Sequence, residues 1–114
     1  MIYLASPYTD DDPTVRAGRF LAVCRAAATL MQRGEMIFSP IAHSHPVAAV
    51  GCLHGDFAAW KSWNFDMLKR CDSLAVLMLP GWEESAGVSG EVNEAQRLGM
   101  KIAYLDATSL KEVA

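Results

Sequence analysis

The sequence predicts a single α/β domain in which a parallel β-sheet carries helices on both faces. Short apolar segments alternate along the chain with longer segments whose apolar residues recur at helical spacing. One short segment, residues 73–79, is apolar at nearly every position, which is typical of a strand covered on both faces. Because 114 residues suffice for one core only, we expect one three-layer sandwich with four or five strands.

The first half of the chain begins with a strand at residues 1–5, which ends at the turn-forming sequence S-P-Y-T-D-D-D-P. Asp12 and Pro13 are a typical N-cap and first helical residue, so a helix is expected to begin there. It should end just before Gly34, and residues 36–40 should form a second short strand.

The second half begins with residues 41–56, which we expect to be a long irregular connection because prolines and glycines interrupt them. Asp56 can then cap a helix that extends to about Arg70. The remaining expected elements are a strand at residues 73–79, a helix at residues 88–98 and a strand at residues 101–105.

The segment from Pro80 to Glu91 is the strongest functional signal, because it connects a buried strand to a helix. In parallel sheets ligands bind beyond the carboxyl ends of the strands, and free N–H groups at a helix start attract anions. Ser85 and Gly87 can therefore surround a phosphate or carboxylate, while Glu91 directs its own carboxylate into the same crevice. This arrangement favours an enzyme that acts on a phosphorylated small molecule.

The composition excludes several classes of protein. A net charge of −3 lacks the clustered Lys and Arg that binding a long nucleic acid requires. Three cysteines without a C-x-x-C pair indicate neither disulfides nor zinc, and no apolar segment is long enough to span a membrane. We expect a cytoplasmic protein without a basic leader. Because 52% of the residues are hydrophobic, we also expect a homodimer or homotetramer.

Three segments carry a resemblance to a known family: Y-L-A-S-P-Y, W-N-F-D-M-L-K-R-C-D-S-L-A-V-L and S-A-G-V-S-G-E-V-N-E-A. In this order they resemble the nucleoside 2-deoxyribosyltransferase superfamily over nearly the whole chain. The resemblance implies a flavodoxin-like, Rossmann-like fold and no cofactor. It also implies cleavage of the N-glycosidic bond of nucleosides or their 5′-monophosphates through a glycosyl intermediate on a glutamate.

The resemblance assigns roles to four residues. Glu91 matches the nucleophilic glutamate of an S-x-G-x-x-x-E pattern, and Tyr3 matches the tyrosine that hydrogen-bonds it. Asp66 matches the aspartate that helps to protonate the departing base. Ser85 matches a serine that binds the 5′-phosphate in nucleoside monophosphate hydrolases, whereas members that act on free nucleosides look to have aspartate there. The resemblance therefore implies a nucleotide hydrolase.

The loop after the first strand departs from the monophosphate hydrolases, because it lacks their arginine and paired glycines. Ser6, Tyr8, Thr9 or Arg16 is expected to supply the missing phosphate contact, and Pro7 belongs to the same binding loop. The S-H-P segment and the tryptophans look more like a little-characterised bacterial and phage branch of the superfamily; these tryptophans are Trp60, Trp63 and Trp82.

Plain structural alternatives exist for the four assigned residues. Glu91 can be a glutamate that the dipole favours at a helix start, and Ser85 an ordinary N-cap. Asp66 lies off the apolar stripe of its helix and can be a solvated carboxylate. Tyr3 can be a packed aromatic residue of a buried strand.

Histidines and tryptophans near the expected rim leave further alternatives open. His43 and His45 are candidates for contact with a base or phosphate, while Trp63 and Trp82 can stack on a base or pack. The histidines, His54 included, do not have the spacing of a metal site, so we expect no bound metal.

The leading hypothesis is an N-glycosidase that splits a nucleoside 5′-monophosphate, with 2′-deoxyribose preferred, into base and sugar phosphate. One alternative is a nucleoside 2-deoxyribosyltransferase, in which another base replaces water. The other is a non-catalytic nucleotide-binding module that uses only the turn at Ser85 and Gly87.

Overall fold

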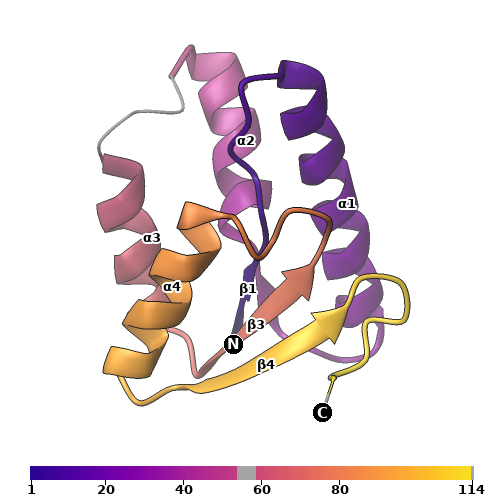
Figure 1. Ribbon diagram of the computed structural model, residues 1–114, viewed down its shortest axis with the longest axis vertical. Coiled ribbons are helices and arrows are strands. Elements are labelled where there is room, and N and C mark those ends of the chain that lie inside the picture. The colour runs from indigo at the N-terminus through magenta and orange to yellow at the C-terminus, as the bar shows by residue number, and fades with distance from the viewer. Residues whose placement is uncertain (54–58, 114) are drawn as a thin grey trace.

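A computed structural model describes residues 1–53 and 59–113 of the chain (Figure 1). Within them, four parallel strands form one sheet in the order β2-β1-β3-β4. The strands are β1 (Ile2–Ala5), β2 (Ile37–Phe38), β3 (Ser73–Met78) and β4 (Lys101–Asp106). The helices are α1 (Pro13–Gln32), α2 (Pro40–Gly51), α3 (Ala59–Lys69) and α4 (Ala86–Arg97). The predicted α/β class is confirmed, with the flavodoxin-like three-layer arrangement.

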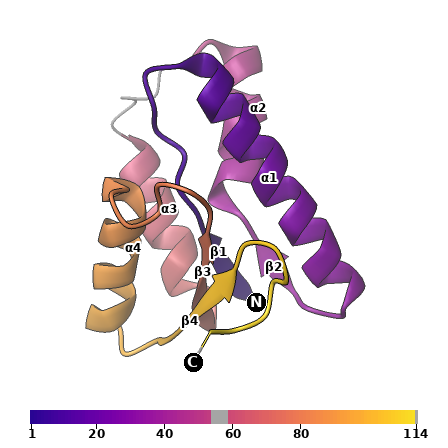
Figure 2. The ribbon, with the colours of Figure 1, turned by 45° about the vertical axis from the view of Figure 1, so that its right-hand side comes forward.

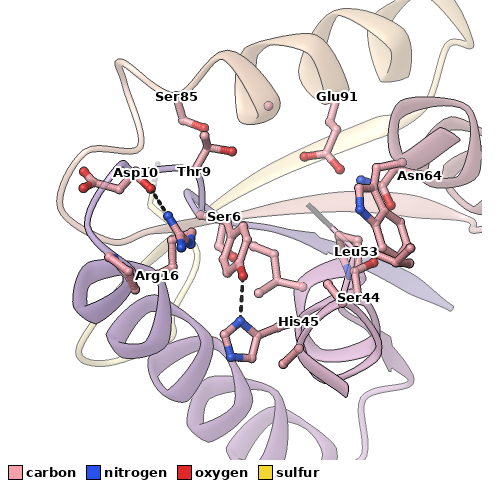
Figure 3. Close-up of a pocket in the computed structure, with 18 of the residues that line it drawn as sticks. Ser6, Thr9, Asp10, Arg16, Ser44, His45, Leu53, Asn64, Ser85 and Glu91 are labelled. Carbon is pink, nitrogen blue, oxygen red and sulfur yellow. Dashed lines mark hydrogen bonds between the residues drawn. The ribbon is translucent and has the colours of Figure 1, made fainter. Parts of the chain in front are cut away.

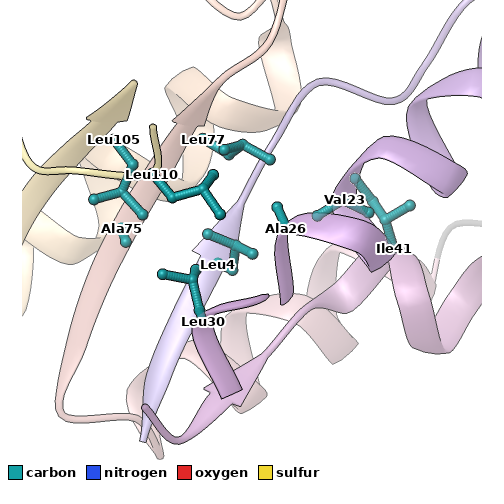
Figure 4. Packing of buried hydrophobic residues seen from close by; sticks show 9 residues of the cluster. All are labelled: Leu4, Val23, Ala26, Leu30, Ile41, Ala75, Leu77, Leu105 and Leu110. Carbon is teal, nitrogen blue, oxygen red and sulfur yellow. The ribbon is translucent and has the colours of Figure 1, made fainter. Parts of the chain in front are cut away.

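Figure 2 shows α1 and α2 on one side of the sheet and α3 and α4 on the other. Successive side chains of a strand point to opposite faces, so each strand contributes to two apolar clusters. The cluster beneath α1 contains Leu4, Val23, Ala26, Leu30, Ile41, Ala75, Leu77, Leu105 and Leu110 (Figure 4). The cluster beneath α3 and α4 contains Tyr3, Ala5, Leu68, Leu74, Val76, Val88 and Ala95.

The start of α1 follows the sequence-based expectation. The Asp12 side chain accepts a hydrogen bond of 2.8 Å from the Thr14 N–H, and Pro13 is the first helical residue. Gly34 follows the helix with a φ of +92°, a conformation that favours glycine. After β4 the chain returns to the sheet, and Leu110 is buried in the core beneath α1.

The prediction of an irregular connection over residues 41–56 is wrong, because α2 occupies most of it. The Ser39 side chain accepts a hydrogen bond of 3.1 Å from the Ala42 N–H, and Pro40 is the first helical residue. Pro46 lies inside the helix, which continues through it to a left-handed cap at Cys52. The second strand is correspondingly shorter than predicted.

The expected roles of His54 and Asp56 concern residues outside the described part of the chain. Within the described part, α3 is in the expected place and ends at Lys69. No helix among these residues is long and apolar enough to cross a bilayer.

Replacement of Leu4 by alanine should destabilise the fold by about 2–5 kcal/mol, because its fully buried side chain lies at the centre of the core beneath α1. Urea denaturation followed by circular dichroism measures this loss. Leu21→Ala is the matched control, since Leu21 is 48% exposed on α1 and should change stability by less than about 0.5 kcal/mol. Equal losses in the two variants would contradict the assignment of the core.

Candidate active site

A cavity of about 590 Å³ lies beyond the carboxyl ends of β1, β2 and β3 (Figure 3). The loop after β1, the inward face of α2, the side of α3 and the first turns of α4 form its walls. This is the position at which parallel sheets bind ligands. The location expected from the sequence is therefore hollow in the structure.

Glu91 extends from the second turn of α4 into this cavity (Figure 3). Glu91 is only 7% exposed, and the hydroxyl of the fully buried Tyr3 donates a hydrogen bond to its carboxylate. Tyr3 belongs to β1, so this bond joins the centre of the sheet to the last helix. The predicted pairing of the two side chains is present.

Burial of the Glu91 carboxyl raises its pKa to about 7, and the hydrogen bond from Tyr3 acts in the opposite direction. Burial also raises the pKa of the Tyr3 phenol, and the Glu91 charge adds to this effect. Tyr3 therefore stays protonated and able to donate, whereas Glu91 changes between acid and carboxylate near neutral pH. A carboxyl group poised in this way within a cavity is typical of catalytic sites.

Ser85 is the N-cap of α4, and its side chain accepts a hydrogen bond of 3.2 Å from the Val88 N–H. The N–H groups of a first helical turn have no acceptor within the helix, and Gly87 in that turn lines the cavity. The structure thus brings Ser85, Gly87 and Glu91 to one cavity. The cap also explains why α4 begins at Ala86, two residues earlier than predicted.

The loop after β1 places Ser6, Tyr8 and Thr9 along the cavity, while Pro7 is buried and does not line it. The Tyr8 hydroxyl lies 2.6 Å from His45 Nδ1, so His45 also reaches the cavity from α2. The Tyr8–His45 bond therefore ties the loop after β1 to α2 on the wall of the cavity.

Charged groups of both signs gather at the same end of the cavity. Arg16 lines it and donates a hydrogen bond to the backbone carbonyl of Asp10. Asp10 and Asp11 line it as well. One guanidinium and a helix N-terminus therefore lie near two carboxylates. The balance between these positive and negative groups decides whether this end of the cavity binds an anionic or a neutral group.

The structure does not bring Asp66 to the cavity. Asp66 forms ion pairs with Lys69 and Arg70 on the solvent side of α3, and the hydrogen bond from Arg70 is the main cause of its lowered pKa. The reason is helical geometry. Asn64 lines the cavity, and a residue two positions later lies about 200° further round the helix.

The expected aromatic contacts are likewise divided. His43 stacks on Trp63 with ring centroids 5.2 Å apart, and neither residue lines the cavity. Trp82 packs against Tyr104 in the core beneath α4, away from the cavity. Trp60, by contrast, lines the cavity.

Ser44 and Asn64 were not singled out by the sequence, yet both line the cavity. Asn64 follows Trp60 by four residues and Ser44 precedes Ala48 by four, so each pair shares one helix face. That spacing was the available signal, but it does not show what the two faces oppose. Among the described residues, no three His, Cys, Asp or Glu side chains are grouped so that they could hold a metal ion.

Comparison with known proteins gives one family match. A family model described as "Domain of unknown function (DUF1937)" matches residues 1–106, which is nearly the whole chain. No curated protein matches the chain.

Replacement of Glu91 by glutamine should stabilise the protein in a pH-dependent manner. Because the folded-state pKa of Glu91 is about 7 and the ordinary pKa of a glutamate is 4.5, its favourable contribution to stability is complete below pH 4.5 and is lost as pH rises through 7. At pH 8 the loss amounts to about 3 kcal/mol, and the neutral glutamine avoids it.

Chemical denaturation of both proteins between pH 4 and pH 8 measures this difference. Glu84→Gln is the control, because Glu84 is an exposed residue near the start of the same helix. The stability of Glu91→Gln and wild type should diverge as pH rises. A constant difference across this range would contradict the buried, neutral-pH carboxyl group.

Proposed function

The chain belongs to the family described as a domain of unknown function, DUF1937, and we propose that it is an N-glycosidase that acts on a nucleoside 5′-monophosphate. The observation that carries this proposal is the buried Tyr3–Glu91 pair, which shares one cavity with the capped start of α4. A nucleophilic or charge-stabilising carboxylate and an anion-binding helix start are the two groups that this reaction needs.

Cleavage of an N-glycosidic bond develops positive charge at the anomeric carbon of the sugar. The Glu91 carboxylate attacks this carbon, the bond to the base nitrogen breaks, and its electron pair leaves with the base, which takes up a proton from solvent. Water then hydrolyses the glycosyl ester and gives up a proton to solvent, so that the sugar phosphate is released with retained configuration and the Glu91 carboxylate is regenerated. Tyr3 holds the carboxylate in place throughout, because its own pKa is raised and it remains a donor.

The dimensions of α4 suit a sugar phosphate. Glu91 comes six positions after Ser85, which corresponds to about 9 Å along the helix axis. Helical side chains lean towards the N-terminus, so the Glu91 carboxylate lies nearer to the first turn than this. A phosphate at the N–H groups of residues 86 and 87, with Arg16 beside it, leaves the sugar next to Glu91.

A second candidate is a nucleoside 2-deoxyribosyltransferase, and the carboxylates of Asp10 and Asp11 favour it. Both residues line the end of the cavity at which the phosphate is placed, and they repel a dianion while accepting hydrogen bonds from a free 5′-hydroxyl. The chemistry at Glu91 is the same in both candidates. They differ in the 5′ group of the substrate and in the acceptor of the sugar.

The decisive assay measures base release by chromatography from the common 2′-deoxynucleosides and their 5′-monophosphates, with and without a second free base. We expect release from at least one monophosphate in water alone, and loss of more than 1,000-fold in Glu91→Gln because the nucleophile is gone. Glu84→Gln should retain wild-type activity. Undiminished release by Glu91→Gln would rule out the proposed role, and exchange on free nucleosides alone would establish the second candidate.

The Asp66→Asn variant tests whether Asp66 protonates the departing base, as the resemblance implies, or has no part in the reaction, as its position outside the cavity indicates. Since Asp66 lies outside the cavity and its pKa is lowered, it is a poor source of a proton for the departing base. We expect kcat/KM to stay within about threefold of wild type, compared with the 10²–10⁴-fold that general acid catalysis supplies. A decrease in kcat/KM of about 100-fold, with unchanged thermal stability, would show that Asp66 takes part in the reaction.

A further inference from the structure

Three residues that line the cavity each carry a buried side-chain polar atom that has no hydrogen-bond partner within the described residues. These atoms are Ser6 Oγ, Ser44 Oγ and Asn64 Oδ1. Ser6 is only 5% exposed, so bulk water does not satisfy its hydroxyl. Buried polar atoms in folded proteins are nearly always paired, and three unpaired ones at a single cavity indicate the places where ligand atoms bind.

Ser44 and Asn64 lie together at one end of the cavity. Figure 3 shows them beside Leu53, while Ser85 and Arg16 lie on the opposite side and Glu91 between the two groups. Leu53 is apolar, and Ile41, Ala48 and Trp60 contribute further apolar surface to the cavity. Apolar walls with a few convergent polar atoms are typical of sites for flat heteroaromatic groups.

We propose that Asn64 and Ser44 form the subsite that selects the base, and that the selected base carries an exocyclic amino group, as adenine and cytosine do. This inference rests on the proposed function. The unpaired atom of Asn64 is an acceptor, and an amino group is the donor that projects furthest from a nucleobase. The amide of the same side chain can donate to the ring nitrogen beside it, as Asn does with adenine. Ser44 contributes a hydroxyl from the facing helix.

The position of Glu91 between the two groups agrees with this assignment. A nucleotide bound with its phosphate at the start of α4 and its base between α2 and α3 presents the bond between sugar and base to Glu91. Asn64 and Ser44 then act on the choice of base and not on the bond cleavage. Their substitution should change affinity and base preference more than the rate of the chemical step.

Calorimetry in the Glu91→Gln background tests the subsite without turnover. The probes are dAMP, dIMP, dCMP and dUMP, which differ pairwise by an amino or an oxo group. We expect dAMP or dCMP to bind about tenfold more tightly than its oxo counterpart, and Asn64→Leu to remove this preference by weakening the amino base alone. Ser44→Ala should weaken the same base severalfold.

Matched controls are Asn93→Leu and Ser62→Ala, which alter exposed residues of α4 and α3. Asn64→Leu should not lower the melting temperature, because it replaces an unpaired buried polar atom with an apolar group. Should that variant fail to fold, Asn64→Ala provides the same comparison. A preference for the oxo base, or a preference that survives both Asn64 variants, would overturn the proposal.

The outcomes separate this inference from the proposed function. Base release that depends on Glu91, together with a base preference that Asn64 substitutions do not change, would overturn the proposed subsite but not the proposed glycosidase activity. Amino-selective binding that depends on Asn64, without base release by wild type, would support the subsite and overturn the enzyme. Failure of all four nucleotides to bind would overturn the subsite directly.

Discussion

A hydrogen bond between a strand tyrosine and a helix glutamate governs the geometry of the site. Burial of a carboxyl group is unfavourable unless the group is neutral or hydrogen-bonded, and Glu91 meets both conditions near pH 7 through its raised pKa and Tyr3. Because Tyr3 is fully buried in β1, the bond fixes the second turn of α4 over the carboxyl end of the sheet. The same helix begins at Ser85, so the position of its free N–H groups is fixed as well.

The cavity around this bond is divided by chemistry. One end combines a helix N-terminus, Arg16 and two aspartates, whereas Leu53 and the polar side chains of Ser44 and Asn64 lie at the other. Glu91 lies between these ends (Figure 3). A molecule with a polar group on one side of a sugar and a flat base on the other matches this division, which is the physical basis for both proposals. Because two aspartates lie at the polar end, the affinity for a substrate depends on the charge of its 5′ group.

The sequence predicts the features that depend on local chemistry. Asp12 and Pro13 start α1 as expected, the strands alternate between two cores, and Ser85, Gly87 and Glu91 meet in one cavity. The helix α2, which the sequence analysis missed, has the same start as α1, a capping side chain followed by proline. It was not predicted because Pro46 lies in its interior, where proline usually interrupts a helix. Asn64 and Ser44 could not be found in this way. Their importance arises from the facing of two helices, which is a tertiary contact, and the resemblance points to Asp66 on the other side of α3.

The ionisation of Glu91 is the most direct test of this account. Carbon-13 NMR of the labelled side-chain carboxyl group follows it through a pH titration of the wild type and of Tyr3→Phe. We expect a midpoint near pH 7 in the wild type and a higher one in Tyr3→Phe, because the tyrosine hydrogen bond lowers the pKa of Glu91. A midpoint near 4.5 that the tyrosine substitution leaves unchanged would contradict it.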